Sequence, residues 1–101
     1  MDGTHAIGVD VGGTKILAGV VGRDGAIVQR HERATPDSQD ELLRELRAAV
    51  EELRDDRIAA VGFGIPAPID QRRGRVYQAV NTPIADVDFR DVMHEQLGLP
   101  V

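Results

Sequence analysis

A glycine-rich segment near the N-terminus, residues 10–15 (DVGGTK), combines residue types that suit a polyphosphate. Two adjacent glycines can turn successive backbone N–H groups toward one concavity, a kind of nest that binds anions. Thr14 adds a hydroxyl donor, and Lys15 adds a mobile positive charge that can meet phosphate oxygens. Asp10 would repel a bare phosphate, so its presence predicts a Mg²⁺ ion or its water shell between the two. The segment indicates a site for a metal-bridged phosphate chain, with a plain hairpin turn and a solvated Asp10 as the alternative.

Two better-known glycine motifs fit the sequence less well. A Walker loop needs lysine followed by serine or threonine at the start of a helix, whereas here threonine precedes lysine and a strand pattern follows. Residues 62–67 match the relaxed dinucleotide-binding spacing, which also has to open a helix. Pro66 and Pro68 disfavour a helix at that point, so we do not expect a Rossmann site.

The glycine segment lies between two predicted strands. Residues 4–11 alternate apolar and polar or small side chains with a period of two, which predicts a strand. Residues 14–21 are rich in β-branched and small side chains and predict a second strand, and the tight-turn sequence at 23–25 leads into a third over 26–33. Three strands joined by short turns predict an antiparallel meander.

A helix and a buried strand follow the meander. Ser38 and Glu41 form a capping box, and the apolar residues after them recur at helical spacing. Residues 58–65 are a short apolar run without polar alternation, which is typical of a strand buried on both faces and paired in parallel after a crossover helix. Residues 76–80 predict a short extra strand or a loop.

The chain is expected to end in a second helix. Asp88 is placed to cap it, and the apolar side chains that follow share one face. Gly98 predicts its C-terminal cap, with Pro100 beyond it as a terminator.

Composition limits the classes of protein to which the chain can belong. It has 101 residues, of which 42% are hydrophobic, a net charge of −5, three aromatic side chains and no cysteine. A disulfide framework, a thiolate zinc site and a cysteine nucleophile are therefore excluded. The negative charge and the few aromatic rings argue against binding of nucleic acid. The apolar runs are too short for a signal peptide or a transmembrane helix, so we expect one small domain without a membrane partner.

Four segments together resemble one protein family. Residues 8–15 resemble the first phosphate-binding motif of the sugar-kinase, hexokinase and actin superfamily, in the form found in the ROK family, which includes bacterial glucokinases. Residues 61–70 are similar to the family's glycine–proline loop, and residues 81–84 to its asparagine–x–proline turn. Residues 89–101 look like the helix that leads into the family's next strand. The resemblance covers essentially the whole chain.

The resemblance implies an α/β fold, the ribonuclease-H-like half of an actin-type ATPase. That half has a three-stranded antiparallel meander, a crossover helix, parallel strands and a C-terminal helix. It also implies that the glycine segment faces the ATP phosphates and Mg²⁺, with Asp10 holding the metal through water and with phosphate-binding residues Asp10, Gly12, Gly13, Thr14 and Lys15. The sugar pocket would be bordered by Gly64, Pro66 and Ala67. Many members have glycine at the position of Ala67, so its methyl group predicts a tighter or shifted loop.

The implied function is the N-terminal, ATP-binding part of a cytoplasmic, glucokinase-like sugar kinase acting on a hexose. The family's catalytic base is expected beyond Val101, and the final strand and the second lobe are not part of residues 1–101. We therefore expect a single incomplete lobe, inactive alone, whose partners are a sugar and a nucleotide. Its vacant strand edge predicts self-association into a homo-oligomer. Two alternatives stay open, the sugar-sensing domain of a ROK transcriptional regulator and a non-catalytic interaction module of the same fold.

Overall fold

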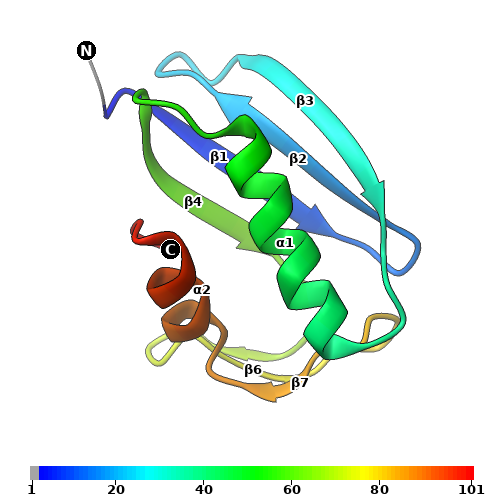
Figure 1. Cartoon of the computed structure of the whole chain (residues 1–101). Coiled ribbons are helices and arrows are strands. Elements are labelled where there is room, and N and C mark those ends of the chain that lie inside the picture. The colour runs from blue at the N-terminus through cyan, green and yellow to red at the C-terminus, as the bar shows by residue number, and fades with distance from the viewer. Residues whose placement is uncertain (1–2) are drawn as a thin grey trace.

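The computed structural model describes residues 3–101 as a four-stranded sheet, a small three-stranded sheet and two helices (Figure 1). In chain order the elements are β1 (His5–Val11), β2 (Lys15–Val21), β3 (Ile27–Ala34), α1 (Gln39–Leu53), β4 (Ile58–Gly64), β5 (Ile69–Asp70), β6 (Arg75–Gln78), β7 (Ala85–Val87) and α2 (Phe89–Leu97).

The larger sheet has the strand order β3-β2-β1-β4. Strands β1, β2 and β3 pair antiparallel through short turns, whereas β4 joins β1 in parallel after the chain has crossed over through α1. In this register Gly8 of β1 lies opposite Gly19 of β2 on one side and Gly62 of β4 on the other. The predicted meander, crossover helix and parallel strand are all confirmed.

Helix α1 begins where the capping box places it. Ser38 is the N-cap residue, and its Oγ accepts a hydrogen bond from the backbone N–H of Glu41 at 3.3 Å. The helix crosses one face of the larger sheet (Figure 1) and buries its apolar stripe there, namely Leu42, Leu46, Ala49, Val50 and Leu53. On the neighbouring strand Arg33 contacts both Glu45 and Glu52, at 3.1 and 2.6 Å, so ion pairs join β3 to the outer side of the helix.

Helix α2 confirms the predicted apolar face and C-cap but not the predicted N-cap bond. Phe89, Met93 and Leu97 are buried, and Gly98 ends the helix in the left-handed conformation at φ 69°. Asp88 is the N-cap residue, yet its side chain makes no capping hydrogen bond. Its Oδ1 instead accepts from Arg75 Nη1 at 3.1 Å, because β6 brings a guanidinium beside the start of the helix. Neither helix of residues 3–101 has the length and apolar character needed to cross a membrane.

The smaller sheet, in the order β5-β6-β7, lies between β4 and α2 in the chain. The segment predicted as a strand or a loop, residues 76–80, overlaps β6, which begins one residue earlier and ends at Gln78. Strands β5 and β7 are too short to be predicted from periodicity. The rings of Phe63 and Phe89 meet edge to face with their centroids 5.0 Å apart, which ties β4 to α2. Both helices thus cover the same side of the larger sheet.

The opposite side of that sheet is exposed, which corrects one prediction. We call it the open face; it carries Gly8, Asp10, Lys15, Leu17, Gly19, Arg30, Glu32, Gly62 and Gly64. The sequence predicted that β4 is buried on both faces, but Gly62 and Gly64 are exposed. The prediction failed because the residues of β4 that face the open side include Gly62 and Gly64. A glycine has no side chain, so its presence in an apolar run does not indicate whether that side of the strand is buried or exposed.

Candidate phosphate-binding site

The glycine segment forms a tight connection between β1 and β2. The Gly12 N–H donates to the Lys15 carbonyl oxygen at 3.0 Å, so the amide of Gly12 closes the hairpin. Within residues 3–101 the N–H groups of Gly13 and Thr14 donate to no other group, and no hydrogen bond returns from the Lys15 N–H to the Gly12 carbonyl. The sequence predicted free amides at both glycines. That prediction is wrong for Gly12, whose N–H is bonded. The unbonded donors are the N–H groups of Gly13 and Thr14.

Two other segments hold the turn in place. Thr35 donates through its N–H to the Thr14 carbonyl at 3.0 Å and through its Oγ1 to the Gly12 carbonyl at 2.8 Å. Asn81 lies against Gly13, since a Cβ built on Gly13 would come within 2.9 Å of the Asn81 carbonyl oxygen. Sequence reasoning missed Thr35. The sequence does contain a signal for it. Thr35 stands before a proline at the end of the third strand, and in an antiparallel meander that end lies beside the turn between the first two strands.

The two glycines are required by contacts inside the chain. A Cβ on Gly12 would lie 2.9 Å from the Lys15 carbonyl oxygen, and one on Gly13 would collide with the backbone of Asn81. Both positions therefore require glycine whether or not a phosphate binds there. The argument for a phosphate site rests instead on the directions of the amides and on the charges beside them.

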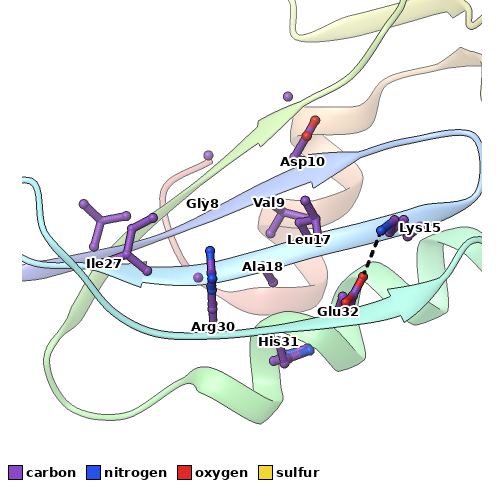
Figure 2. Close-up of a pocket in the computed structure, with 14 residues that line it drawn as sticks. Gly8, Val9, Asp10, Lys15, Leu17, Ala18, Ile27, Arg30, His31 and Glu32 are labelled. Carbon is purple, nitrogen blue, oxygen red and sulfur yellow. Dashed lines mark ion pairs between the residues drawn. The ribbon is translucent and has the colours of Figure 1, made fainter.

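Asp10 and Lys15 both lie on the open face, near the end of the sheet where the turn is (Figure 2). Lys15 Nζ is 3.5 Å from Glu32 Oε2, and both side chains are largely exposed. The Asp10 carboxylate makes no hydrogen bond or ion pair within the described part of the chain. Its Oδ1 lies 3.8 Å from where a Cβ on Gly64 would be. The missing side chain of Gly64 thus leaves Asp10 accessible at the carboxyl ends of two parallel strands.

The site fits a Mg²⁺ ion bound mainly by its ligand. No group of three or more histidine, cysteine, aspartate or glutamate side chains in residues 3–101 is arranged to hold a metal. A single exposed carboxylate is what Mg²⁺ typically takes from a protein when phosphates and water supply its other positions. Asp10 is such a carboxylate.

A hollow of about 730 Å³ extends over the open face from these residues. Asp10 and Lys15 lie toward one end of it, and Ile27, which is 60% exposed, lies at the other (Figure 2). Gly64 also lines the hollow, as the register partner of Asp10 on β4. His31 also reaches its edge, but its ring is directed to the helix side of the sheet, where Nε2 lies 3.3 Å from the Ala49 carbonyl oxygen.

The structure brings Gly64 into this hollow but not the rest of the predicted sugar-binding group. Pro66 is exposed on the loop between β4 and β5, and Ala67 packs partly against the hydrophobic core. The Ala67 N–H donates to the Ile65 carbonyl at 2.8 Å, which makes this loop a tight turn followed by a strand. Since no helix begins there, the dinucleotide-binding motif is excluded, as the prolines predicted.

Comparison with known proteins relates the chain to one family. The sequence pattern that defines the family described as "ROK family" matches residues 6–101 of the chain. The chain is 38% identical over 96 residues to a glucokinase of Streptomyces coelicolor, an alignment that covers 94% of this chain and 30% of that protein. The chain thus spans about a third of the length of such relatives.

Solved structures agree in fold. The ROK family glucokinase from Streptomyces griseus, in complex with glucose and AMPPNP, superposes with a TM-score of 0.86 at 37% identity, over 96% of this chain and 31% of that one. A ROK family transcriptional regulator, a homolog of the E. coli MLC protein, superposes with a TM-score of 0.87 over 98% of this chain and 27% of its own, at 18% identity. The second likeness concerns the fold alone.

Proposed function

The chain belongs to the ROK family, and on that basis we propose that it is the phosphate-binding N-terminal part of a glucokinase-like, ATP-dependent sugar kinase. The observation that carries the proposal is the pair of unbonded N–H groups of Gly13 and Thr14, at the same end of the sheet as Asp10 and Lys15. Backbone amides that have no partner in the chain are ready donors for phosphate oxygens.

Each side chain at the turn has a separate role in this proposal. The amides of the turn and the Thr14 hydroxyl donate to phosphate oxygens, and Lys15 neutralises part of their charge. Asp10 accepts hydrogen bonds from the water shell of Mg²⁺ and so holds the ion beside the phosphates. Mg²⁺, when bound, supplies positive charge to the phosphoryl group being transferred.

Gly64 gives the sugar and the phosphates a common border. It lines the same hollow as Asp10 and has no side chain that would separate the two ligands. The neighbouring loop residues Pro66 and Ala67 belong to the proposed sugar side through their backbone groups. This arrangement is consistent with a hexose hydroxyl that approaches the terminal phosphate.

The 101 residues form one wall of the proposed active site. A kinase needs a base near the sugar hydroxyl and a closed site that excludes water. The ionisable side chains of the hollow that could act as a base all have other roles in this proposal: Asp10 holds the metal, Glu32 pairs with Lys15, and His31 is engaged with α1. We therefore propose that the chain is a single lobe, that it has no kinase activity alone, and that a second lobe completes the site; the relatives are about three times as long as the part that matches this chain.

Titration of the ¹⁵N-labelled chain with Mg·ATP tests the proposal. The amide resonances of Gly13, Thr14 and Lys15 are expected to shift together and to saturate, whereas those of Gly25, in the distant β2–β3 turn, should not move. If the three amides remain unchanged at millimolar Mg·ATP, the proposed phosphate site is wrong.

A sugar-sensing domain is the second candidate, because the superposition with a transcriptional regulator covers 98% of this chain. A sensor would respond to a hexose without nucleotide. Shifts confined to residues 64–67 on addition of glucose alone, with a silent glycine turn under Mg·ATP, would favour that candidate over the kinase.

A further inference from the structure

Thr35 makes two hydrogen bonds to the glycine turn, and both go to carbonyl oxygens. Its N–H bonds to Thr14 and its hydroxyl to Gly12, at 3.0 and 2.8 Å. Thr35 lies just beyond β3, on the neighbouring strand of the meander, and is 23 residues from Gly12 in sequence. It is therefore a long-range contact of the turn.

These two bonds determine where the amides of the turn point. In a trans peptide the C=O and the following N–H are directed oppositely. With the Gly12 and Thr14 carbonyls directed to Thr35, the N–H groups of Gly13 and Lys15 must point away from it. The two donors therefore lie on a common side of the turn.

The hydroxyl bond also keeps the hairpin from closing completely. A two-residue hairpin commonly exchanges two hydrogen bonds between its flanking residues, here Gly12 and Lys15. Only the bond from the Gly12 N–H to the Lys15 carbonyl is present. The Gly12 carbonyl is directed to the Thr35 hydroxyl instead, and the Lys15 N–H makes no hydrogen bond to it.

Thr35 itself is held in the conformation that this requires. The residue before a proline is restricted to extended backbone, and Pro36 follows. A β-branched side chain has few χ1 rotamers, so the hydroxyl loses little freedom when it binds. The side chain is also partly buried. The sequence Thr-Pro at this point thus provides a rigid donor.

We infer that Thr35 is a positioning residue for phosphate binding: its hydroxyl captures the Gly12 carbonyl and thereby leaves the Lys15 amide free and directs it, with that of Gly13, toward the ligand. The inference rests on the proposed function, because it assigns a ligand to those amides. Both hydrogen bonds that Thr35 donates go to the turn, so in this proposal it acts through the turn and not by contact with the phosphates.

Hydrogen exchange of the ligand-free chain tests the geometry. Thr35→Val keeps the shape and the backbone bond to Thr14 but removes the hydroxyl. The released Gly12 carbonyl can then accept the Lys15 N–H, so exchange at Lys15 should become slower and the Gly12 carbonyl ¹³C resonance should shift. Thr35→Ser should restore both values. If Thr35→Val only loosened the turn, exchange at Lys15 would become faster. Unchanged or faster exchange at Lys15 in this variant would therefore overturn the inference.

Titration with Mg²⁺ and inorganic tripolyphosphate tests the consequence for binding. Thr35→Val should bind about tenfold more weakly, the effect of losing one hydrogen bond to a charged group. Thr35→Ser should bind like the wild type. Thr4→Val, which removes a hydroxyl that contacts His5 at the far end of β1, controls for general destabilisation. Equal affinity of the wild type and Thr35→Val would overturn the inference alone, whereas no binding by the wild type would overturn the proposed phosphate site and, with it, the ligand that we assign to the amides.

Discussion

Arg54 joins the ends of the two helices, because its Nη1 donates to the carbonyl oxygen of Leu97 at 2.7 Å. The same nitrogen lies 3.0 Å from Glu51 Oε1, which orients the guanidinium. Leu97 is the last residue of α2, and its carbonyl has no partner within the helix. Arg54, which directly follows α1, therefore supplies the hydrogen bond that the last carbonyl of α2 lacks within its own helix.

Replacement of Arg54 by methionine should loosen α2. We expect the free energy of unfolding to fall by about 1 kcal/mol, since the bond involves a charged donor but is partly exposed. For a domain of this size the melting temperature would drop by roughly 4–8 °C. Thermal unfolding followed by circular dichroism measures the change. Arg47→Met, on an exposed part of α1, is the control, and an equal loss in that variant would contradict the role of Arg54.

Ser38→Ala should shorten α1 at its first turn. The Ser38 hydroxyl is the acceptor for the Glu41 N–H, and loss of an N-cap costs about 1 kcal/mol. Urea unfolding would report a lower midpoint with an unchanged slope. Ser38→Asp keeps an acceptor at this position and should retain most of the stability. If alanine and aspartate behave alike, the cap makes no contribution.

Gly74→Ala should be more damaging than Gly25→Ala. Both glycines have positive φ, at 67° and 85°, so each alanine bears the cost of the left-handed conformation, about 1 kcal/mol. A Cβ on Gly25 meets nothing within 4 Å, whereas one on Gly74 collides with Arg90, whose Nε would be 2.7 Å away. Arg90 also donates to the carbonyls of Gln71 and Arg72. The difference in unfolding free energy between the two variants measures the collision, and no difference would mean that Arg90 moves away freely.

Asp55 should contribute to the acid sensitivity of the chain. Hydrogen bonds from Arg57, first from its guanidinium and then from its backbone N–H, lower the pKa of Asp55 from 3.8 to about 2. A carboxyl group with a lowered pKa in the folded state stabilises it above the unfolded pKa, and this contribution is lost as the pH falls through the folded value. Unfolding free energy measured between pH 4 and pH 2 should therefore fall less steeply in Asp55→Asn. Asp56→Asn is the neighbouring control, and identical pH profiles of wild type and Asp55→Asn would contradict the prediction.

Glu32 should compete with a phosphate ligand for Lys15. The two side chains are 3.5 Å apart and exposed, so their attraction is worth at most about 1 kcal/mol. Glu32→Gln should therefore tighten binding of Mg·ATP by up to about fivefold at low salt, and Lys15→Met should weaken it. Both affinities come from the amide titration of the turn. A weaker affinity in Glu32→Gln would show that Glu32 assists the ligand instead.

Local signals predicted most of the elements correctly. Period-two alternation identified β1, the capping box identified the start of α1, and the glycine at position 98 identified the end of α2. These features depend on residues a few positions apart, so the sequence contains them directly. Strands β5 and β7, of two and three residues, exist through pairing with β6 and have no periodicity of their own.

The candidate site was predictable in its residue types and less so in its geometry. The segment around Gly12 and Gly13 indicated a tight turn, but which amides stay unbonded depends on Thr35, which only the fold brings near. Asp88 shows the same limit, because its carboxylate binds Arg75 in place of the helix that it precedes. Contacts between distant segments compete with local ones, and a local pattern does not reveal which contact is stronger.

The row of Gly62, Gly8 and Gly19 across the open face has a consequence for engineering. A Cβ on Gly8 or on Gly62 would meet nothing within 4 Å, and alanine is the more favourable residue inside a strand. A redesign guided only by the stability of these 101 residues would therefore replace both glycines. In doing so it would place two methyl groups in the hollow that Gly8 and Gly62 line, and it would make that hollow shallower in return for a small gain in melting temperature.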